Sequence, residues 1–233
     1  MSRDDFSERV AGVAALAEPV RRDLYRYVAA QAEPVSRDQA CEGLKIARHT
    51  AKFHLDKLVE EGLLVTTYKR LSDRRGPGAG RPTKLYRRSD RELSVSVPER
   101  RYDLAGQLMA RAIEESARSG VPVIQALQSA AAELGRGLGD QMRSRMERGR
   151  SRQRLLDAAS ETLTDYGYEP SQDGNTLHLV NCPFHLLAQD HTDLVCGMNM
   201  ALLAGAADQV GDDKLTVRLD PSPGRCCVVV TAA

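Results

Sequence analysis

Apolar side chains recur at helical spacing through the first sixty residues. Residues 1–18 are interpreted as a short lead-in. A first helix is expected over residues 19–30, because proline is favoured in the first helical turn and apolar positions then repeat every three or four residues. Ser36 is a good N-cap for a second helix that continues to Leu44. A third helix is expected over about residues 47–61, with one apolar stripe formed by Ala51, Leu55, Leu58 and Val59.

Two short runs of strand-forming residues follow the third helix. They cover residues 63–68 and 84–87, and the sequence between them is rich in glycine, proline and arginine. This pattern predicts a β-hairpin with a long flexible tip. Residues 69–91 hold nine basic side chains and two acidic ones, so the hairpin is strongly basic.

Helical patterns return in the middle of the chain, and a mixed pattern ends it. Helices are expected over residues 102–119, from Pro122 through Leu138, and over 155–166. The arginine-rich stretch 135–154 is expected to be exposed and partly mobile. In the last part of the chain, strands and one helix are expected to alternate. The strands are predicted at residues 177–180, 214–219 and 226–231, and the helix at 191–203.

Charge is unevenly distributed along the 233 residues. The net charge is only +1, but residues 1–100 hold 20 basic and 15 acidic side chains, whereas residues 101–233 hold 13 and 17. A basic first half indicates that this part meets a polyanion. Hydrophobic residues make up 42% of the chain, which excludes wholesale disorder.

Cellular location is predicted from two absences. No apolar run approaches the 18 residues that a membrane helix needs, and the N-terminus lacks the layout of a signal peptide. We therefore expect a cytoplasmic protein without a membrane partner. Five cysteines are an odd number for such a chain, so a disulfide framework is not expected. Four of them fall within the last 52 residues, which leaves metal or redox chemistry open.

Three helices followed by a basic hairpin with a glycine-rich tip predict a winged helix-turn-helix. In this arrangement the third helix enters the major groove of DNA, while its apolar stripe stays on its own domain. The alternative is a small helical domain that contacts proteins. The residues that we expect to contact DNA are polar or exposed positions of the third helix and the hairpin tip: Arg48, His49, Thr50, Lys52, Phe53, Arg74, Arg75 and Arg81.

The same segment resembles a known class of bacterial transcription regulators. The stretch from Ser36 to Leu63, with its His54-Leu55 pair, Leu58 and Gly62, is similar to the recognition unit of ArsR-like regulators. The hairpin sequence Gly80-Arg81-Pro82-Thr83-Lys84-Leu85-Tyr86 is similar to the wing of the SufR group within that class. The resemblance covers roughly residues 15–90 and implies a winged-helix fold that binds an operator in double-stranded DNA.

The second chemical signal is a group of cysteines near the end of the chain. Cys182, Cys196, Cys226 and Cys227 follow the spacing C-x13-C-x29-C-C, and His185 and His191 lie among them. Thiolates are soft ligands that suit iron–sulfur clusters or Zn²⁺, and imidazole suits either. The spacing lacks the close C-x2-C knuckle of zinc ribbons. The alternative is that these thiols pack in the core as small hydrophobic groups, as free cysteines often do.

This cysteine pattern resembles the C-terminal part of the SufR-type repressors, which sense iron–sulfur status. The resemblance implies that Cys182, Cys196 and Cys226 are ligands of an iron–sulfur cluster. A further cysteine that some of these proteins carry is missing at residues 209–211. A fourth ligand would then come from Cys227, His185, His191 or an exogenous group. If residues 226–231 form a strand, adjacent side chains point to opposite faces, and one of the two neighbouring cysteines belongs to the core.

Enzyme activity is not expected. The chain has no Gly-x-Ser-x-Gly elbow and no glycine-rich phosphate loop after a strand, and a Cys–His pair here lacks a third orienting residue. The helices near 102–118 and 122–141 are the best candidates for a homodimer interface, since two half-sites need two recognition helices. Two other hypotheses remain. In the first, the second half of the chain binds a small organic effector or structural zinc. In the second, the protein is an interaction scaffold with no DNA role.

The predicted fold class is therefore α+β. It combines an N-terminal winged helix-turn-helix, a helical dimerisation segment and a small C-terminal α/β sensor domain. These parts are expected to cover residues 1–92, 93–150 and 151–233.

Overall fold

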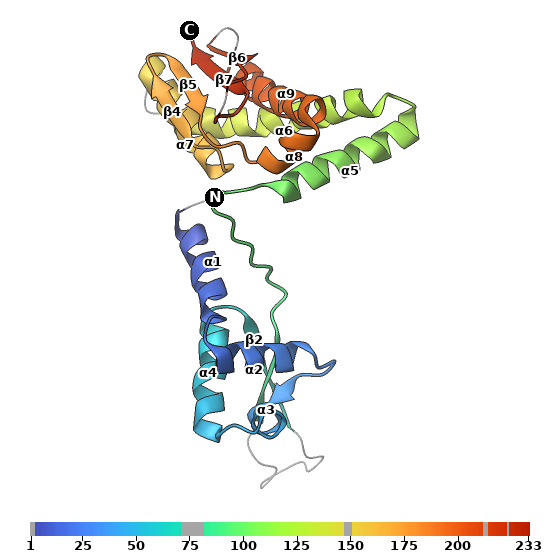
Figure 1. The fold of residues 1–233 in the computed structure, drawn as a ribbon, viewed down its shortest axis with the longest axis vertical. Coiled ribbons are helices and arrows are strands. Elements are labelled where there is room, and N and C mark those ends of the chain that lie inside the picture. The colour runs from blue at the N-terminus through green and yellow to red at the C-terminus, as the bar shows by residue number, and fades with distance from the viewer. Residues whose placement is uncertain (1–2, 71–81, 147–150, 212–213, 223) are drawn as a thin grey trace. The chain divides into compact units, whose positions relative to one another are not determined.

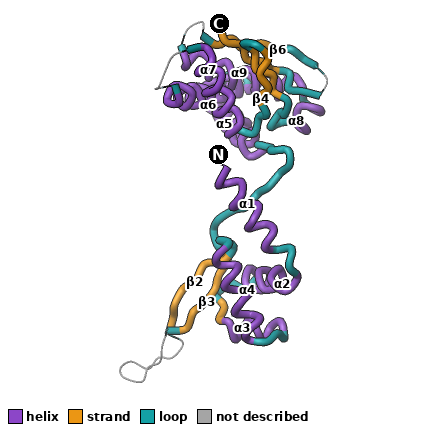
Figure 2. The backbone as a smooth tube through the Cα atoms, turned by 90° about the vertical axis from the view of Figure 1, so that its left-hand side faces the viewer, coloured by secondary structure: helices purple, strands orange, loops and turns teal. Residues whose placement is uncertain are grey.

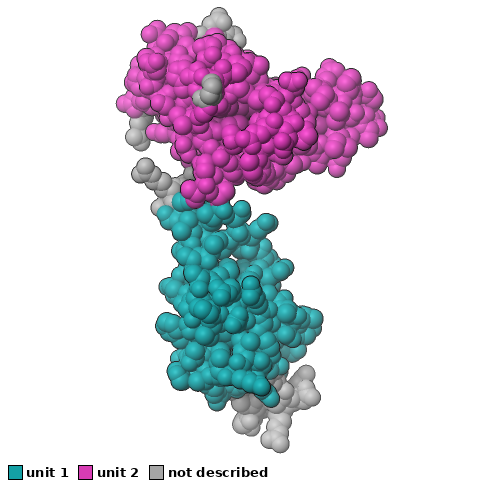
Figure 3. Space-filling view, in the orientation of Figure 1, with its two compact units in different colours: residues 1–95 teal, residues 96–233 magenta. Residues whose placement is uncertain are grey.

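The chain forms two compact units in a computed structural model, which describes residues 3–70, 82–146, 151–211, 214–222 and 224–233. The units are residues 1–95 and 96–233 (Figure 3). Each is one continuous stretch of chain with its own buried apolar core. The fold is a mixture of helices and antiparallel sheets.

The first unit contains the three expected helices and the expected hairpin, which are confirmed. Its three strands form an antiparallel sheet in the order β1-β3-β2. Figure 2 shows β2 beside β3. In this sheet Leu64 lies opposite Arg88, and Lys69 lies opposite Thr83. The elements, most of them labelled in Figure 1, are α1 (Arg3–Ala15), α2 (Pro19–Ala29), β1 (Val35–Ser36), α3 (Arg37–Leu44), α4 (Arg48–Glu60), β2 (Leu64–Lys69) and β3 (Thr83–Arg88).

Local sequence signals set the helix ends in this unit. The Ser36 hydroxyl accepts a hydrogen bond from the Gln39 N–H at 3.2 Å, and the Gln39 side chain accepts one from the Ser36 N–H at 2.8 Å. This capping box satisfies two backbone donors that the first turn of α3 would otherwise leave unpaired. Lys45 adopts a left-handed conformation and ends the same helix. The start of α3 therefore follows from residues readable in the sequence, whereas its end at a left-handed lysine does not.

The prediction that residues 1–18 are a lead-in is wrong, because most of them form α1. Its apolar residues Phe6, Val10 and Val13 lie at helical spacing but remain 36%, 39% and 45% exposed. The spacing of these residues is that of a helix, but their side chains are only partly buried.

The second unit packs helices against a four-stranded antiparallel sheet. The strand order is β4-β5-β7-β6. The central strand β7 is buried, with Val228 and Val229 fully covered. The elements are α5 (Tyr102–Ser119), α6 (Val123–Arg145), α7 (Arg152–Asp165), β4 (Pro170–Asp173), β5 (Thr176–Leu179), α8 (His185–Asp190), α9 (Thr192–Val210), β6 (Leu215–Leu219) and β7 (Val228–Ala232).

Close packing of α6 against α9 holds this unit together (Figure 1). A Cβ atom added at Gly135 would lie 1.9 Å from the Leu202 carbonyl oxygen, and one at Gly205 would lie 2.2 Å from the Ala132 carbonyl oxygen. Glycine is therefore required where the two backbones approach. The stretch 135–154 begins in helix α6, which buries Gly135, Leu138 and Met142 on one face and exposes Arg136 and Arg143 on the other. Helix α6 packs in the same compact unit as the last part of the chain.

Several boundaries in the last part of the chain also differ from expectation. The short elements β4 and α8 were not predicted, and α9 continues to Val210 rather than ending at residue 203. The last strand begins at Val228, two residues later than expected. Among the described residues, no helix combines the length and the hydropathy that a transmembrane span requires.

Candidate nucleic-acid interface and cysteine site

The outward face of α4 carries most of the predicted DNA-contacting residues. Ala51, Leu55 and Leu58 are fully buried and fix the helix on the core of the first unit. On its other side the exposed fraction of Phe53 is 65%. Thr50 is half-buried, whereas the remaining predicted residues of this helix are exposed: Arg48, His49 and Lys52. The predicted hairpin-tip residues Arg74, Arg75 and Arg81 lie outside the described part of the chain.

An ion pair between neighbouring helices holds Arg48. Its Nη2 atom lies 2.6 Å from Oδ1 and 2.7 Å from Oδ2 of Asp38 on α3. Both side chains are mostly exposed, so the pair contributes little to stability. Its main effect is to restrict where the guanidinium can point.

A second polar network ties the hairpin to α4. The Lys84 Nζ atom donates a hydrogen bond to the Asp56 carboxylate at 2.7 Å, and the Tyr86 hydroxyl donates to the same carboxylate at 3.4 Å. Burial opposes the charge on Lys84, but the hydrogen bond with Asp56 keeps its pKa above the ordinary value. A hollow of about 370 Å³ lies between the hairpin and α3–α4. The network therefore fixes the angle between the hairpin and the outward face of α4.

The second unit brings the four C-terminal cysteines together. Cys182 lies in the turn before α8, Cys196 lies on α9, and the neighbouring pair Cys226–Cys227 precedes β7. All four are free thiols. They interact as a chain of neighbours, in which Cys182 contacts Cys226, Cys226 contacts Cys227, and Cys227 contacts Cys196. Residues 45 positions apart in the sequence thus share one site.

Both members of the adjacent pair belong to this site. As expected, one of the two, Cys226, packs in the core cluster of the second unit. The reason is not the alternation of a strand, because β7 begins at Val228, after both cysteines. Cys226 is 2% exposed and Cys227 is half-buried, and their thiols interact with each other.

Hydrogen bonds between the thiols, backbone N–H donors and burial shift the pKa values of these cysteines. The hydrogen bond with Cys226 lowers the pKa of Cys182, and the same contact raises the pKa of Cys226 to about 12. Burial raises the pKa of Cys196 to about 12. The backbone N–H of Phe184 donates to the Cys182 sulfur, and that of Val228 donates to the Cys226 sulfur. Donors of this kind stabilise sulfur that carries negative charge.

The turn that carries Cys182 is attached to the segment before α5. The Asn181 side chain is buried and donates to the carbonyl oxygens of Glu99 at 3.0 Å and Gly167 at 2.7 Å. Arg100 donates to the Asn181 side chain and, at 3.0 Å, to the Cys182 carbonyl oxygen. Hydrogen bonds therefore link the turn of Cys182 to residues 99 and 100, which lie a few positions after the start of the second unit at Ser96.

His185 contributes its backbone to this region, but its side chain is exposed. Its N–H donates to the Cys182 carbonyl oxygen at 3.1 Å, while its Nε2 atom lies 3.3 Å from the Gln189 amide. His191 is exposed at the start of α9. In the ranges that the structure describes, no group of three or more Cys, His, Asp or Glu side chains is arranged to hold a metal ion. The four thiols are neighbours, but they do not surround a common point.

Two functional candidates in this site were not found from the sequence. Asn199 is 1% exposed on α9, and its amide nitrogen donates to the Cys226 sulfur at 3.3 Å. The Tyr168 hydroxyl donates to the Asn199 amide oxygen. The sequence signal for Asn199 is that it is the one amide side chain in the apolar stretch from Val195 to Leu203. A search for metal ligands does not consider asparagine in such a stretch.

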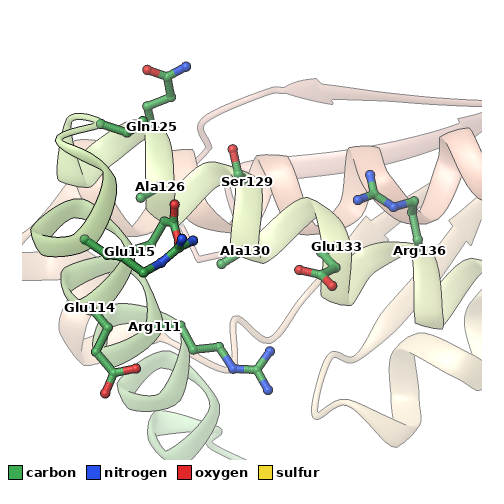
Figure 4. Close-up of a pocket in the computed structure, with 11 residues that line it drawn as sticks. Arg111, Glu114, Glu115, Gln125, Ala126, Ser129, Ala130, Glu133 and Arg136 are labelled. Atoms are coloured by element: carbon green, nitrogen blue, oxygen red, sulfur yellow. The ribbon is translucent and has the colours of Figure 1, made fainter.

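An open groove between α5 and α6 is a further feature of this unit. Its volume is about 650 Å³, and charged side chains of both signs line it (Figure 4). The basic members are Arg111, Arg118 and Arg136, and the acidic members are Glu114, Glu115 and Glu133.

Comparison with known proteins identifies the first unit. A family model described as a helix-turn-helix domain matches residues 16–67, which include α2, α3 and α4. No curated protein and no solved structure matches the chain. The N-terminal unit therefore contains a helix-turn-helix domain, and such a domain suggests a DNA-binding transcriptional regulator. The match ends well before the cysteine site.

Proposed function

We propose that this protein is a transcription regulator whose second unit binds an iron–sulfur cluster and senses redox or iron status. The observation that carries the proposal is the gathering of four free thiols beside backbone and side-chain N–H donors. Sulfur ligands and N–H donors to sulfur are what such clusters use in proteins. The donor set thus fits a cluster in its chemistry.

Cys182, Cys196 and Cys226 are the proposed ligands. Cys227 is the best candidate for the fourth, because it contacts both Cys196 and Cys226 while the side chain of His185 is exposed. The thiols would need to move together to enclose a metal centre, as expected of a site that is not preformed without its metal. A bound cluster would supply one-electron redox chemistry.

In the first unit, we propose that α4 enters the major groove of operator DNA. Arg48, His49, Thr50, Lys52 and Phe53 would then face the bases and phosphates, and the hairpin would follow the adjacent backbone. The contacts of Lys84 with Asp56 support this proposal, since they set the angle between the hairpin and α4.

We also propose that two copies pair through α5 and α6. An interface with two-fold symmetry places the same patch on both partners, so it must be complementary to itself. The groove between these helices has three arginines and three glutamates, which satisfies this condition. Ile113 and Ile124 are 60% and 48% exposed on the same two helices and would be covered by a second copy. Loss or oxidation of the cluster would change the spacing of the two recognition helices.

The test is an anaerobic purification followed by an absorption spectrum and assays of iron, sulfide and zinc. We expect a brown protein with comparable amounts of iron and sulfide. The substitution Cys182→Ser is expected to abolish the cluster and to leave non-specific affinity for duplex DNA unchanged. Cys41→Ser is the matched control, because Cys41 packs in the core of the first unit.

Other outcomes would replace this proposal. An unchanged cluster in the Cys182→Ser protein would refute the ligand assignment. Stoichiometric zinc without sulfide would make the site structural. Protein with neither metal would favour the reading in which the thiols are buried core and the effector is a small organic molecule.

A further inference from the structure

A buried amide lies directly behind one of the four thiols. Asn199 is surrounded on α9 by apolar residues that are also buried, such as Met198 and Leu202. Its amide nitrogen lies 3.3 Å from the Cys226 sulfur, and its amide oxygen accepts a hydrogen bond from the Tyr168 hydroxyl. Burying these two polar groups costs free energy that an apolar pair of the same size would not cost.

The Tyr168 contact determines which end of the amide meets the sulfur. Tyr168 is 1% exposed, so its hydroxyl depends on a protein acceptor, which the Asn199 oxygen provides. The NH2 group of Asn199 is consequently left facing the Cys226 sulfur. A deprotonated sulfur can only accept hydrogen bonds, so this orientation matches a thiolate ligand.

Resting on the function proposed above, we infer that Asn199 is a positioning residue of the cysteine site. Its amide, held by Tyr168, aims the Cys226 sulfur at its neighbouring thiols and stabilises that sulfur as a ligand for soft metals. Groups that orient a ligand from behind in this way commonly change metal affinity by about 10- to 100-fold when they are removed.

The decisive variant removes both polar partners together. Asn199→Leu with Tyr168→Phe keeps the side-chain volumes close to the original and leaves no buried polar group without a partner. Tyr168→Phe alone is a milder second variant, which retains the packing of the ring. Thr162→Val is the matched control, because Thr162 is also buried and polar in this unit but hydrogen-bonds to the Ala158 carbonyl oxygen and to Arg145.

The probe is Cd²⁺, a soft ion whose bonds to thiolates absorb in the ultraviolet. Titration of the reduced full-length protein against a competing chelator gives the affinity without requiring a cluster. We expect the double variant to bind Cd²⁺ about 10-fold more weakly than the original protein. Tyr168→Phe alone is expected to lose part of that affinity, and Thr162→Val none of it.

A second measurement applies to the cluster itself. Hydrogen bonds to sulfur raise the reduction potential of such clusters, since they favour the more negative reduced state. The double variant, once reconstituted, is therefore expected to have a more negative potential than the original protein. A change confined to folding stability would leave this potential unmoved.

The two proposals fail in different ways. Protein that binds Cd²⁺ with the expected differences but takes up no iron and sulfide refutes the cluster and supports the role of Asn199. Equal Cd²⁺ affinities in the original protein and the double variant would overturn that role, as would an equal loss in Thr162→Val. Absence of Cd²⁺ binding by the original protein would overturn both.

Discussion

At the scale of single residues, the cations on the outward face of α4 are not equivalent. Arg48 is held by Asp38 at 2.6 Å, whereas Lys52, one turn further along the helix, is exposed. A guanidinium that is already paired must leave its carboxylate, or share it, before it meets a DNA phosphate. Lys52 therefore provides the cleaner test of the proposed interface.

Lys52→Ala is expected to weaken binding to duplex DNA of any sequence. The logarithm of the affinity falls as the logarithm of the salt concentration rises. Removal of one phosphate contact makes this negative slope shallower by about 0.9. Fluorescence anisotropy at several salt concentrations measures this slope. Lys214→Ala, in the second unit, is the control and should leave the slope unchanged. An unaltered slope in Lys52→Ala would place that residue away from the phosphates.

At the scale of elements, the helix pair α6–α9 depends on glycine at chosen positions only. Gly135 and Gly137 lie on the same helix, but an added Cβ would meet the Leu202 carbonyl oxygen at 1.9 Å in the first case and nothing within 4 Å in the second. The two glycines thus offer a matched pair of substitutions.

Gly135→Ala is expected to destabilise the second unit by about 1–3 kcal/mol, the usual cost of overpacking. Gly137→Ala should instead stabilise it by roughly 0.5–1 kcal/mol, because alanine is the better residue in an exposed helix interior. Urea denaturation followed by circular dichroism measures both. Equal effects would show that the close approach of α6 and α9 is not maintained in solution.

The same elements show what can be predicted from sequence. Helix α3 is predicted from its N-cap Ser36, which acts on backbone N–H groups close to it in the sequence. The glycines at the α6–α9 contact have no such local signal, because the backbone that they approach lies on α9. The sequence likewise singled out Cys182, Cys196 and Cys226, but their mutual contacts and the contribution of Asn199 depend on how distant segments meet. Local chemistry is readable from a single chain, and tertiary packing is much less so.

At the scale of the whole molecule, each unit has its own core, so we expect a ligand that binds one unit to change the stability of that unit alone. A ligand that binds one unit stabilises that unit according to its concentration relative to its Kd. Since Cys182, Cys196, Cys226 and Cys227 lie within residues 96–233, a soft metal held by them should act on that unit.

Differential scanning calorimetry with Cd²⁺ at 100 times its Kd tests this prediction. The transition of the second unit is expected to rise by on the order of 5–15 °C, which corresponds to about 2.7 kcal/mol of binding free energy. The transition of the first unit should stay where it is. The Cys182→Ser protein serves as the control and should show a smaller rise. A shift of both transitions by the same amount would contradict the assignment of the site to one unit.

The continuity of each unit along the chain also has a consequence for the order of biosynthesis. Residues 1–95 form their unit without any later segment, and domains generally fold in turn as they leave the ribosome. At about 5–20 residues per second, roughly 7–28 s separate the end of residue 95 from the end of the chain. During this interval the nascent polypeptide can present a folded helix-turn-helix while Cys182, Cys196, Cys226 and Cys227 are not yet all made. A newly synthesised molecule would thus fold its helix-turn-helix before the proposed sensing site is complete.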